Sequence, residues 1–548
     1  MVFLYLYLNQ HIMLTKNEKS ELRSTIFRHL DGIATATTAY ALHKKGVLEY
    51  ILAQKKVTLD ELVEKFNAND GYLNVALRVL CSQGWLEQIL DNETDHIFYE
   101  TNSKSNDAFK LVSIYEDAVK LLKYSDRFAE EKMISTDAFI ALERVFKMFE
   151  TNYGLDISDS SSIEFQVLKH LEGVIAGPII VLLGVNGLFH KYFMEASFTA
   201  EEYHKNPESF KKVLDFLAHL GWFKKKKNTY QFTDKGLFFA KRASAYGVTV
   251  SYIPTFLQLD ELIFGNPLVL QTSSPNDTEK HVHREMNVWG SGGAHTTYFK
   301  VIDEVIIDLF NRPIDEQPKG ILDMGCGNGA FIEHIFNIID QQTLRGKLLD
   351  EHPLLLVGAD FNKAALKVTR ANLIKADIWA KVIWGDIGRP DLLASDLKED
   401  YSIELHDLLN VRTFLDHNRI WEAPKKAYDF NSESSGAFAS KGKRLPNNNV
   451  EASLFEHLQK WKPYVEKFGL LIIELHTIDP KLTANSLGKT AATAYDATHG
   501  YSDQYILEVD VFKAVAKEAD LYPDEHHFAK FPDSKLATVS INLLKGRQ

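Results

Sequence analysis

The segment from Gly320 to Phe336 combines a glycine-rich turn with the start of a helix. It reads GILDMGCGNGAFIEHIF, in which a short apolar strand reaches Asp323 and three glycines follow at alternate positions. Glycine lets a backbone turn tightly and approach a ligand closely, and the first turn of a helix offers unpaired N–H groups. The segment therefore predicts a binding site for a nucleoside-containing or anionic ligand.

Two further acids follow at the spacing of successive strand–helix units. The stretch LLLVGADFNKAALKVTRANL predicts a strand ending at Asp360, and AKVIWGDIGRPDLL predicts another ending at Asp386. An acid at the end of the second strand is placed to accept hydrogen bonds from ribose hydroxyls. Each acid alone is also consistent with a helix N-cap. Three such signals in order favour a nucleoside site.

The glycine spacing, G-x-G-x-G after an acid, differs from the G-x-G-x-x-G of dinucleotide sites. It resembles motif I of the class I S-adenosylmethionine (SAM) methyltransferases, and this resemblance implies an α/β, Rossmann-like domain in which Asp386 contacts the adenine. Apolar strands alternate with helices after Lys319, as in a doubly wound parallel sheet. The implied SAM-binding residues are Asp323, Gly325, Gly327, Gly329, Asp360, Phe361, Asp386 and Ile387.

Three polar side chains in the C-terminal region are candidates for the chemistry. SIELHDLLNVRTFLDHNRIW predicts a strand followed by His417, where small-molecule methyltransferases often carry a catalytic histidine. YDATHGYSDQY places His499 and Gln504 five residues apart, just before an amphipathic helix. Two residues are not a coordination shell, so spacing alone favours a structural role for them in a polar turn.

Together with the helical N-terminal region and the SAM motifs, DATHGYSDQY resembles the metal-dependent C-methyltransferase domains of bacterial polyketide synthases, such as those of the apratoxin loading module. This resemblance implies a mononuclear iron or manganese ion held by His499 and Gln504, with His417 as a third ligand or a general base. It also implies methyl transfer to an acidic carbon of an acyl, malonyl-type or β-keto substrate, because a Lewis acid stabilises an enolate. A free and a carrier-protein-bound substrate are both left open.

The main alternative is a metal-independent O-methyltransferase acting on a small hydroxylated metabolite, with His417 as general base. A transcriptional regulator that senses SAM and a protein that only binds SAM are further alternatives. The first half of the chain bears on the regulator, because it contains an internal repeat.

The two copies of this repeat run from Gly46 to Gln88 and from Gly187 to Lys226, each followed by a predicted β hairpin. Each copy predicts a helix, a second helix after a capping box, and an amphipathic helix that ends at Gly-Trp. This is the winged-helix pattern, which serves either DNA binding or packing and dimerisation. The first candidate recognition helix carries only Arg78 as a basic residue and the second only two lysines, so a structural role is favoured.

These motifs divide the chain into six expected units. The stretch Asn287–His295 is rich in glycine and predicts either an ordinary linker or a flexible lid that brings Trp289 or Tyr298 near the sulfonium. Ser434–Asn449 predicts a mobile surface loop. The expected units are an N-terminal extension (1–20), a winged-helix-like repeat (21–103), a helical connector (104–165), a second repeat (166–250), a loop-rich lid or linker (251–300) and the methyltransferase domain (301–548).

Composition limits the partners and the compartment. The net charge of −12 argues against broad nucleic-acid binding. Two cysteines are too few for a disulfide framework, so we expect a cytoplasmic protein. Residues 1–13 lack the basic region of a signal peptide, and Met13 is an alternative start. No apolar run approaches the ~20 residues that span a bilayer, so no membrane partner is expected. A homodimer could form through the N-terminal helical region.

Overall fold

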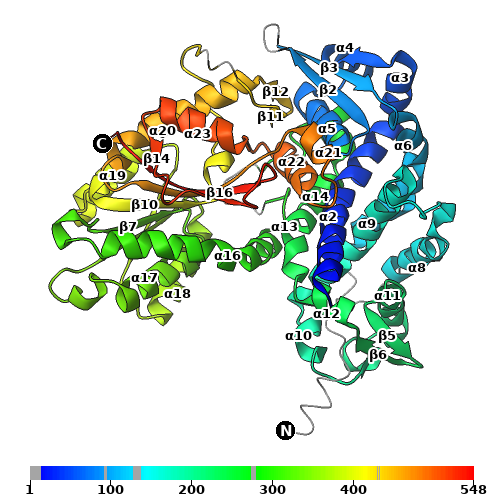
Figure 1. Ribbon diagram of the computed structural model, residues 1–548, viewed down its shortest axis with the longest axis horizontal. Coiled ribbons are helices and arrows are strands. Elements are labelled where there is room, and N and C mark those ends of the chain that lie inside the picture. Colours follow the sequence, from blue (N-terminus) through cyan, green and yellow to red (C-terminus); the bar gives the residue numbers. More distant parts are fainter. Residues whose placement is uncertain are drawn as a thin grey trace.

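The computed structural model consists of a helical half and an α/β half (Figure 1). The helical half is built around two long helices, α2 (Lys16–Lys44) and α9 (Ile163–Val185), which pack against each other along their length. A capping box between Thr15 and Glu18 starts α2. The structure describes residues 14–91, 95–126, 137–272, 279–428, 430 and 432–547, with backbone only for residues 293–297.

Helices α2 and α9 cross where each carries a glycine. A Cβ on Gly32 would lie 2.3 Å from the Cα of His170, and a Cβ on Gly173 would lie 2.4 Å from the carbonyl oxygen of His29. Only glycine lets two backbones come this close. The two glycines are 141 residues apart, and so are the two histidines. The repeat therefore includes the long helices, which precede the motif copies at Gly46 and Gly187 and lie largely within the repeat units expected over 21–103 and 166–250.

Helix α9 is one described helix that is long and apolar enough to cross a membrane. However, 83% of its apolar 18-residue stretch is buried inside the protein. A helix that is apolar on all sides is typical of a protein core as well as of a membrane. No such apolar run was expected from the sequence, and packing against α2 accounts for this one.

Each long helix is followed by a winged-helix unit, as predicted, and we call these units repeat 1 (Val47–Thr101) and repeat 2 (Leu188–Phe232). Their three-stranded sheets have the same order, β1-β3-β2 and β4-β6-β5. Repeat 1 consists of α3 (Val47–Gln54), β1 (Lys56–Thr58), α4 (Leu59–Phe66), α5 (Asp70–Ser82), β2 (Leu86–Asp91) and β3 (His96–Thr101). Repeat 2 consists of α10 (Leu188–Tyr192), β4 (Phe198–Thr199), a short 3-10 turn, α11 (Pro207–His219), β5 (Phe223–Lys226) and β6 (Thr229–Phe232).

The segment between the two halves differs from the loop-rich linker expected over 251–300. A single helix, α16 (Arg284–Phe310), runs through its glycine-rich stretch. Gly290 in this stretch serves close packing rather than flexibility, because a Cβ on it would lie 2.6 Å from the backbone nitrogen of Val248. Shorter helices fill much of the remainder, namely α13 (Gly247–Ser251), α14 (Ile253–Phe256) and α15 (Leu259–Phe264).

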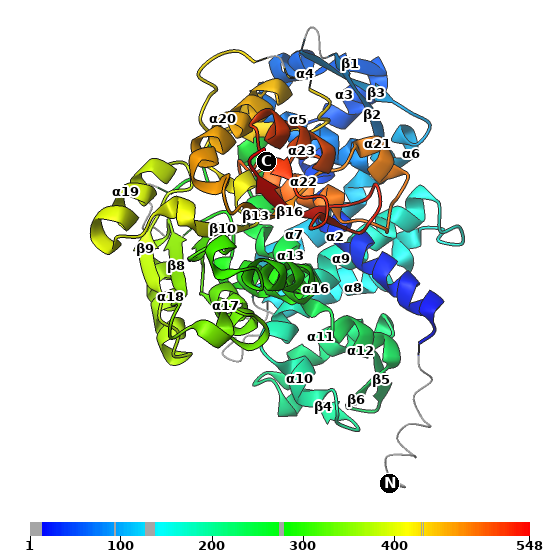
Figure 2. The ribbon, with the colours of Figure 1, turned by 60° about the vertical axis from the view of Figure 1, so that its left-hand side comes forward.

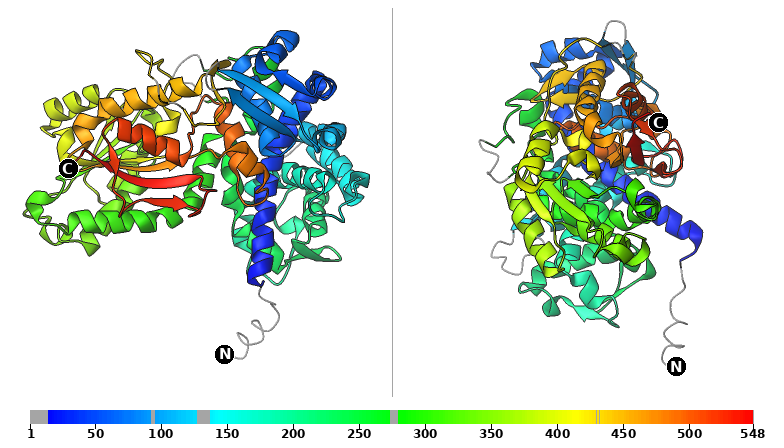
Figure 3. Two further views of the ribbon diagram at one scale, coloured as in Figure 1. Left: turned by 45° about the horizontal axis from the view of Figure 1, so that its top comes forward. Right: turned by 90° about the vertical axis from the view of Figure 1, so that its left-hand side faces the viewer.

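The α/β half contains the predicted Rossmann-like sheet, with strand order β14-β16-β13-β10-β7-β8-β9. Strands β9, β8, β7, β10 and β13 are parallel, whereas β16 is antiparallel to β13, which departs from a fully parallel sheet. Helices cover both faces of this sheet (Figure 3). The strands are β7 (Gly320–Met324), β8 (Leu355–Asp360), β9 (Lys381–Trp384), β10 (Leu408–Thr413), β13 (Leu470–Leu475), β14 (Tyr522–Pro523), β15 (Ala529–Phe531) and β16 (Val539–Lys545).

Buried side chains from the helices fix both faces of the sheet. One apolar cluster joins α16 and α17 to one face, and another joins α19, α20 and α23 to the opposite face. Because the parallel strands share one direction, their carboxyl ends meet at a single edge, where α/β proteins bind ligands. The helices are α17 (Ala330–Gln342), α18 (Lys363–Lys375), α19 (Pro390–Tyr401), α20 (Asn447–Val465), α21 (Pro480–Ala484), α22 (Ala492–Gly500) and α23 (Val509–Glu518).

The two halves meet along α5 of repeat 1. Helix α22 packs against both α2 and α5, and α21 also packs against α5 (Figures 1 and 2). The stretch predicted as a mobile surface loop, Ser434–Asn449, instead contains the hairpin β11 (Phe438–Ser440) and β12 (Lys443–Leu445). The hairpin packs on α5, where the Gly71 N–H donates to the carbonyl of Gly442 at 2.9 Å.

Candidate functional site

The glycine turn lies at the carboxyl end of β7, as predicted. Gly325, Gly327 and Gly329 adopt φ values of 83°, 54° and 81°, which side chains other than glycine rarely adopt. The Gly327 N–H donates to Asp360 Oδ2 at 3.0 Å, and the Asn362 N–H donates to Oδ1 at 2.8 Å. Asp360 thus ties the turn to the end of β8. Each carboxylate oxygen can accept a further hydrogen bond from a ligand.

The next strand ends beside this turn. Asp386 follows β9, and its Oδ1 accepts the N–H of Gly388 at 2.8 Å. The Ile387 side chain is buried, and its carbonyl accepts the indole N–H of Trp461 at 2.7 Å. Phe361 and Trp384 are partly exposed, with ring centroids 5.6 Å apart. Trp384 was not predicted, although an aromatic residue two positions before the Asp386 of a nucleoside motif is a usable signal.

Asp323 occupies a different environment from Asp360, another of the three predicted SAM-binding acids. Its side chain is buried at the end of β7 and is 2% exposed. Burial first, and the nearby Asp360 charge second, raise the pKa of Asp323 to about 7. The structure therefore puts Asp323 beneath the turn, while Asp360 remains half-buried.

The loop that carries His417 contacts the glycine turn. A Cβ on Gly325 would lie 3.1 Å from the side chain of Leu415, two residues before His417. His417 follows β10, and its Nδ1 is hydrogen-bonded to Glu474 Oε1. The His417 backbone N–H donates to the other Glu474 oxygen at 3.2 Å. Glu474 was missed by the sequence analysis, although a lone acid inside the apolar strand LLIIELHTI was a signal for it.

His499 lies in α22 with its ring centroid 5.1 Å from that of His417, and the ring planes meet at 72°. The carbonyl of Tyr495 lies 2.8 Å from His499 Nδ1 and can only accept, so Nδ1 carries the proton and Nε2 has the free lone pair. Burial first, and the neighbouring His417 second, lower the pKa of His499 to about 3. The imidazole is therefore neutral at physiological pH.

Gln504 completes the predicted trio. Its side-chain NH₂ donates to the Tyr252 hydroxyl at 2.9 Å and to Ser502 Oγ at 2.8 Å. Its backbone N–H donates to the carbonyl of His499 at 3.0 Å. Tyr252 comes from the helical half and was missed, because its 252-residue distance from Gln504 leaves no pattern in the sequence.

The atoms of this group that could ligate a metal are uncharged, so they suit a metal that accepts neutral ligands. With Nδ1 of each histidine and the amide nitrogen of Gln504 engaged, the remaining donors are two imidazole Nε2 atoms and one amide oxygen. Among the described residues, no group of three or more His, Cys, Asp or Glu side chains is arranged to hold a metal ion. An ion here would therefore need Gln504 as a ligand.

Two aromatic side chains predicted near the sulfonium, Trp289 and Tyr298, and one core histidine lie outside this group. Trp289 packs against Gly184 in the helical half, so it is not near the glycine turn. Tyr298 packs on Phe414 and Phe531, with ring centroids 6.0 and 5.1 Å away. His476, which follows β13, is a core histidine bonded to the Leu507 carbonyl and to Ser540 Oγ. The side chain of His295 lies outside the described residues.

Three protein-family models match the chain. Residues 279–542 match an AprA MT2-like domain, residues 172–266 match an AprA winged helix domain, and residues 22–88 match an AprA N-terminal domain. The second match includes repeat 2, and the third includes most of repeat 1. No curated protein sequence matches the chain.

Solved structures similar to this chain include several methyltransferases. An O-methyltransferase family protein from Burkholderia thailandensis is 12% identical, with a TM-score of 0.37, over 71% of this chain and 99% of its own. The CurJ carbon methyltransferase is 12% identical, with a TM-score of 0.31, over 78% and 100%. An O-methyltransferase family 2 protein from Planctomyces limnophilus, in complex with apigenin, is 10% identical, with a TM-score of 0.34, over 95% of both chains.

The match to the AprA MT2-like domain extends over the sheet from β7 into β16, including the glycine turn and the end of β8. The motif that the sequence presents and the family that the domain matches thus identify the same cofactor. The chain is an S-adenosylmethionine-dependent methyltransferase.

Proposed function

We propose that this enzyme transfers the methyl group of SAM to an acidic carbon of an acyl, malonyl-type or β-keto substrate, with the help of a bound iron or manganese ion. One observation carries the proposal. The side chains of His417, His499 and Gln504 each have one polar atom held by a hydrogen bond and a second atom left to bind a ligand. Metal-binding histidines are usually held in this way through their other ring nitrogen. The loop that carries His417 contacts the glycine turn.

In this proposal His417, His499 and Gln504 hold the ion. A bound iron or manganese ion supplies Lewis acidity, which stabilises the negative charge of an enolate. Glu474 orients the imidazole of His417, and the Tyr495 carbonyl orients that of His499. Tyr252 holds the amide of Gln504, so that the oxygen is the atom left to bind.

The glycine turn and Asp360 bind and orient SAM in the same proposal. Asp360 accepts the ribose hydroxyls, and the turn lets the cofactor approach the backbone. The contact between Leu415 and Gly325 keeps this cofactor site beside the His417 loop. Holding methyl donor and acceptor carbon in line supplies much of the rate enhancement.

The test is metal analysis of protein purified without chelators, together with Mn²⁺ titration. We expect about one ion per chain and activity on a malonyl-type thioester that EDTA abolishes and Mn²⁺ restores. His499→Ala and Gln504→Ala should lose Mn²⁺ binding and keep SAM affinity. Asp360→Ala should keep Mn²⁺ binding and bind SAM roughly tenfold or more weakly. Full activity in EDTA, with no bound metal, would overturn the metal proposal.

A second function is supported by the His417–Glu474 pair. A histidine oriented by a buried carboxylate is a suitable general base, and this base would deprotonate a substrate hydroxyl in a metal-independent O-methyltransferase. In that case His417→Ala and Glu474→Gln should reduce kcat on a hydroxylated acceptor, with no effect of EDTA. His499→Ala distinguishes the two functions, because only the metal-dependent reaction needs His499 as a ligand.

A further inference from the structure

Arg78 is the one basic residue of α5, the candidate recognition helix of repeat 1. We infer that Arg78 is a positioning residue for His499 in the α/β half, which we now call the methyltransferase half. The inference rests on the proposed function in one respect, because His499 is a metal ligand there. Arg78 is 1% exposed, so it cannot contact a nucleic acid or a second protein.

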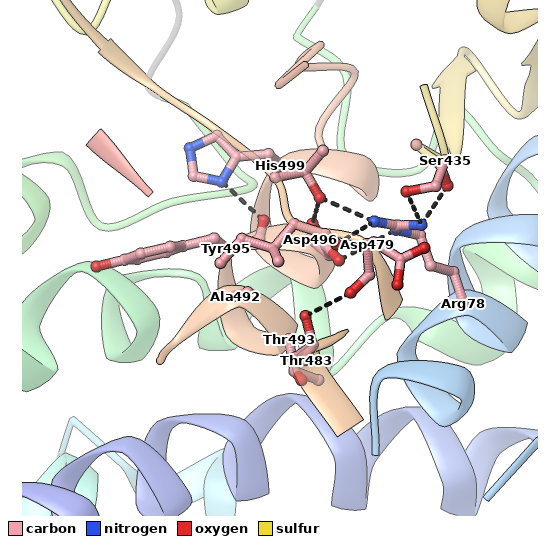
Figure 4. Close-up of polar contacts among 12 residues, drawn as sticks. Arg78, Ser435, Asp479, Thr483, Ala492, Thr493, Tyr495, Asp496 and His499 are labelled. Carbon is pink, nitrogen blue, oxygen red and sulfur yellow. Dashed lines mark hydrogen bonds and ion pairs between the residues drawn. The ribbon is translucent and has the colours of Figure 1, made fainter. Parts of the chain in front are cut away.

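All the hydrogen bonds between the Arg78 side chain and the described residues reach the methyltransferase half (Figure 4). Its guanidinium contacts the Ser435 carbonyl, donates to Thr477 Oγ1 at 2.9 Å and donates to the Ile478 carbonyl at 2.8 Å. Its Nε forms an ion pair with Asp496 Oδ2 at 3.1 Å. The planar guanidinium has five fixed donors and can therefore join three separate segments rigidly.

The contacts continue from Asp496 to His499 along α22. Asp496 lies three residues, about one helical turn, before His499, and its other oxygen accepts the Thr477 hydroxyl at 2.5 Å. The neighbouring Tyr495 carbonyl is the acceptor that fixes the His499 ring. Figure 4 shows the two ends of this path, the guanidinium and the imidazole, on either side of α22. Holding the carboxylate therefore holds the turn that orients the imidazole.

Further contacts from the helical half keep α22 in place. The Gln83 amide, just after α5, donates to Thr493 Oγ1 at 2.8 Å. Thr38 of α2 lies within hydrogen-bond distance, 3.2 Å, of the Tyr501 hydroxyl. Arg78 differs from both because it is charged and because it and Gln504 line one cavity. It is thus the member of this set that shares a cavity with a residue of the candidate site, Gln504.

A second arginine provides a matched control. Arg444 of β12 forms an ion pair with Asp95, which also joins the methyltransferase half to repeat 1. That pair is partly exposed and lies on the hairpin side of the interface, and Arg444 bonds to Asp95 and Asp70, which lie outside α22. Arg444→Met therefore removes a contact of the same chemical type between the same halves.

The experiment compares Arg78→Lys, Arg444→Met and the parent protein by Mn²⁺ affinity, SAM affinity and hydrogen–deuterium exchange of residues 492–500. Lysine keeps the charge beside Asp496 and loses the fork. We expect Arg78→Lys to bind Mn²⁺ roughly 10- to 100-fold more weakly, as for other residues that orient metal ligands. SAM affinity should change less than twofold, α22 should exchange faster, and Arg444→Met should match the parent.

If Arg78→Lys does not fold, the double variant Arg78→Met/Asp496→Asn removes both charges and is measured in its place. Parent-like Mn²⁺ affinity and parent-like exchange of α22 would overturn the inference while leaving the proposed function intact. If the parent protein binds no Mn²⁺, the metal proposal fails, and exchange decides for Arg78. Faster exchange of α22 in Arg78→Lys but not in Arg444→Met supports the inference, and equal exchange overturns it.

Discussion

Repeat 1 and repeat 2 share one motif and use it differently. Six residues before the Gly-Trp that ends each third helix, repeat 1 has Arg78 and repeat 2 has Asp215. Arg78 is buried against the methyltransferase half. Asp215 is one-third exposed, accepts the Tyr230 hydroxyl at 2.7 Å and pairs with Lys225 of its own wing. The comparison teaches that the winged-helix fold is a scaffold here, and that single side chains decide what each copy holds.

The two copies also differ in the buried acids of their long helices. Asp31 of α2 and Glu172 of α9 are equivalent, 141 residues apart, and both are less than 4% exposed. Glu172 accepts from Lys169 at 2.5 Å and lies 3.2 Å from His29, and these groups hold its pKa well below the usual value. Burial instead raises the pKa of Asp31 to about 8. Equivalent positions therefore carry opposite electrostatic properties.

The largest expected effect comes from breaking the Arg78 pair. Arg78→Met leaves Asp496 buried without its cation, and removing one partner of a buried pair costs about 3–5 kcal/mol of stability. Urea unfolding followed by tryptophan fluorescence measures the loss. The double variant Arg78→Met/Asp496→Leu should recover much of it, because no unpaired charge remains. A loss below 1 kcal/mol in the single variant would contradict the buried pairing.

The crossing that joins the long helices of the two copies is the next test. Gly32→Ala and Gly173→Ala each insert a methyl group against the backbone of the partner helix, and such overpacking costs about 1–3 kcal/mol. Gly292→Ala is the control, because a Cβ at that position in α16 meets nothing within 4 Å. Thermal unfolding should show lower midpoints for the first two variants and an equal or higher midpoint for the third.

The equivalent acids should give pH effects of opposite sign. The raised pKa of Asp31 provides stability below its unfolded value of 3.8, and this stability is lost as pH rises towards 8. Asp31→Asn should therefore flatten the fall in unfolding free energy between pH 5 and 8, by about 1 kcal/mol or more. Glu172→Gln should destabilise the protein at pH 7, because its lowered pKa provides stability above 4.5 that is lost on acidification. Equal pH profiles for both variants would refute the contrast.

The smallest effect is expected at the surface pair of repeat 2. Asp215→Ala removes a partly exposed ion pair and should cost less than about 1 kcal/mol. Steady-state methyl transfer by this variant should equal that of the parent protein. A large loss of activity would show that repeat 2 also acts on the site, and it would remove the distinction between the two copies.

Local patterns accounted for much of the fold. The glycine turn, the acids at strand ends and the hairpins of both repeats depend on residues close in sequence, so their spacing predicted them. The site depends on partners from distant segments. Glu474 meets His417 because β10 and β13 are neighbours, and Tyr252 reaches Gln504 from the other half. Such pairings are set by tertiary packing, which leaves no periodicity in one sequence.

Two predictions differ from the structure for different reasons. Glycine predicts flexibility by default, yet in α16 and at the α2–α9 crossing it permits close helix packing. The predicted copies of the motif begin at Gly46 and Gly187, after the long helices, although both helices start at capping residues, Thr15 and Ser162. The paired segments HLDG (His29–Gly32) and HLEG (His170–Gly173) were the available signal.

Helix α16 has a mechanical consequence. Its 27 residues extend about 40 Å, from a contact with Gly247 in the helical half to the apolar cluster under the sheet. A continuous helix transmits displacement rather than absorbing it, so a shift of α13 would also displace the sheet beside the glycine turn. Substrate entry should therefore involve movement of loops around a rigid α16, rather than rotation of the two halves about a hinge.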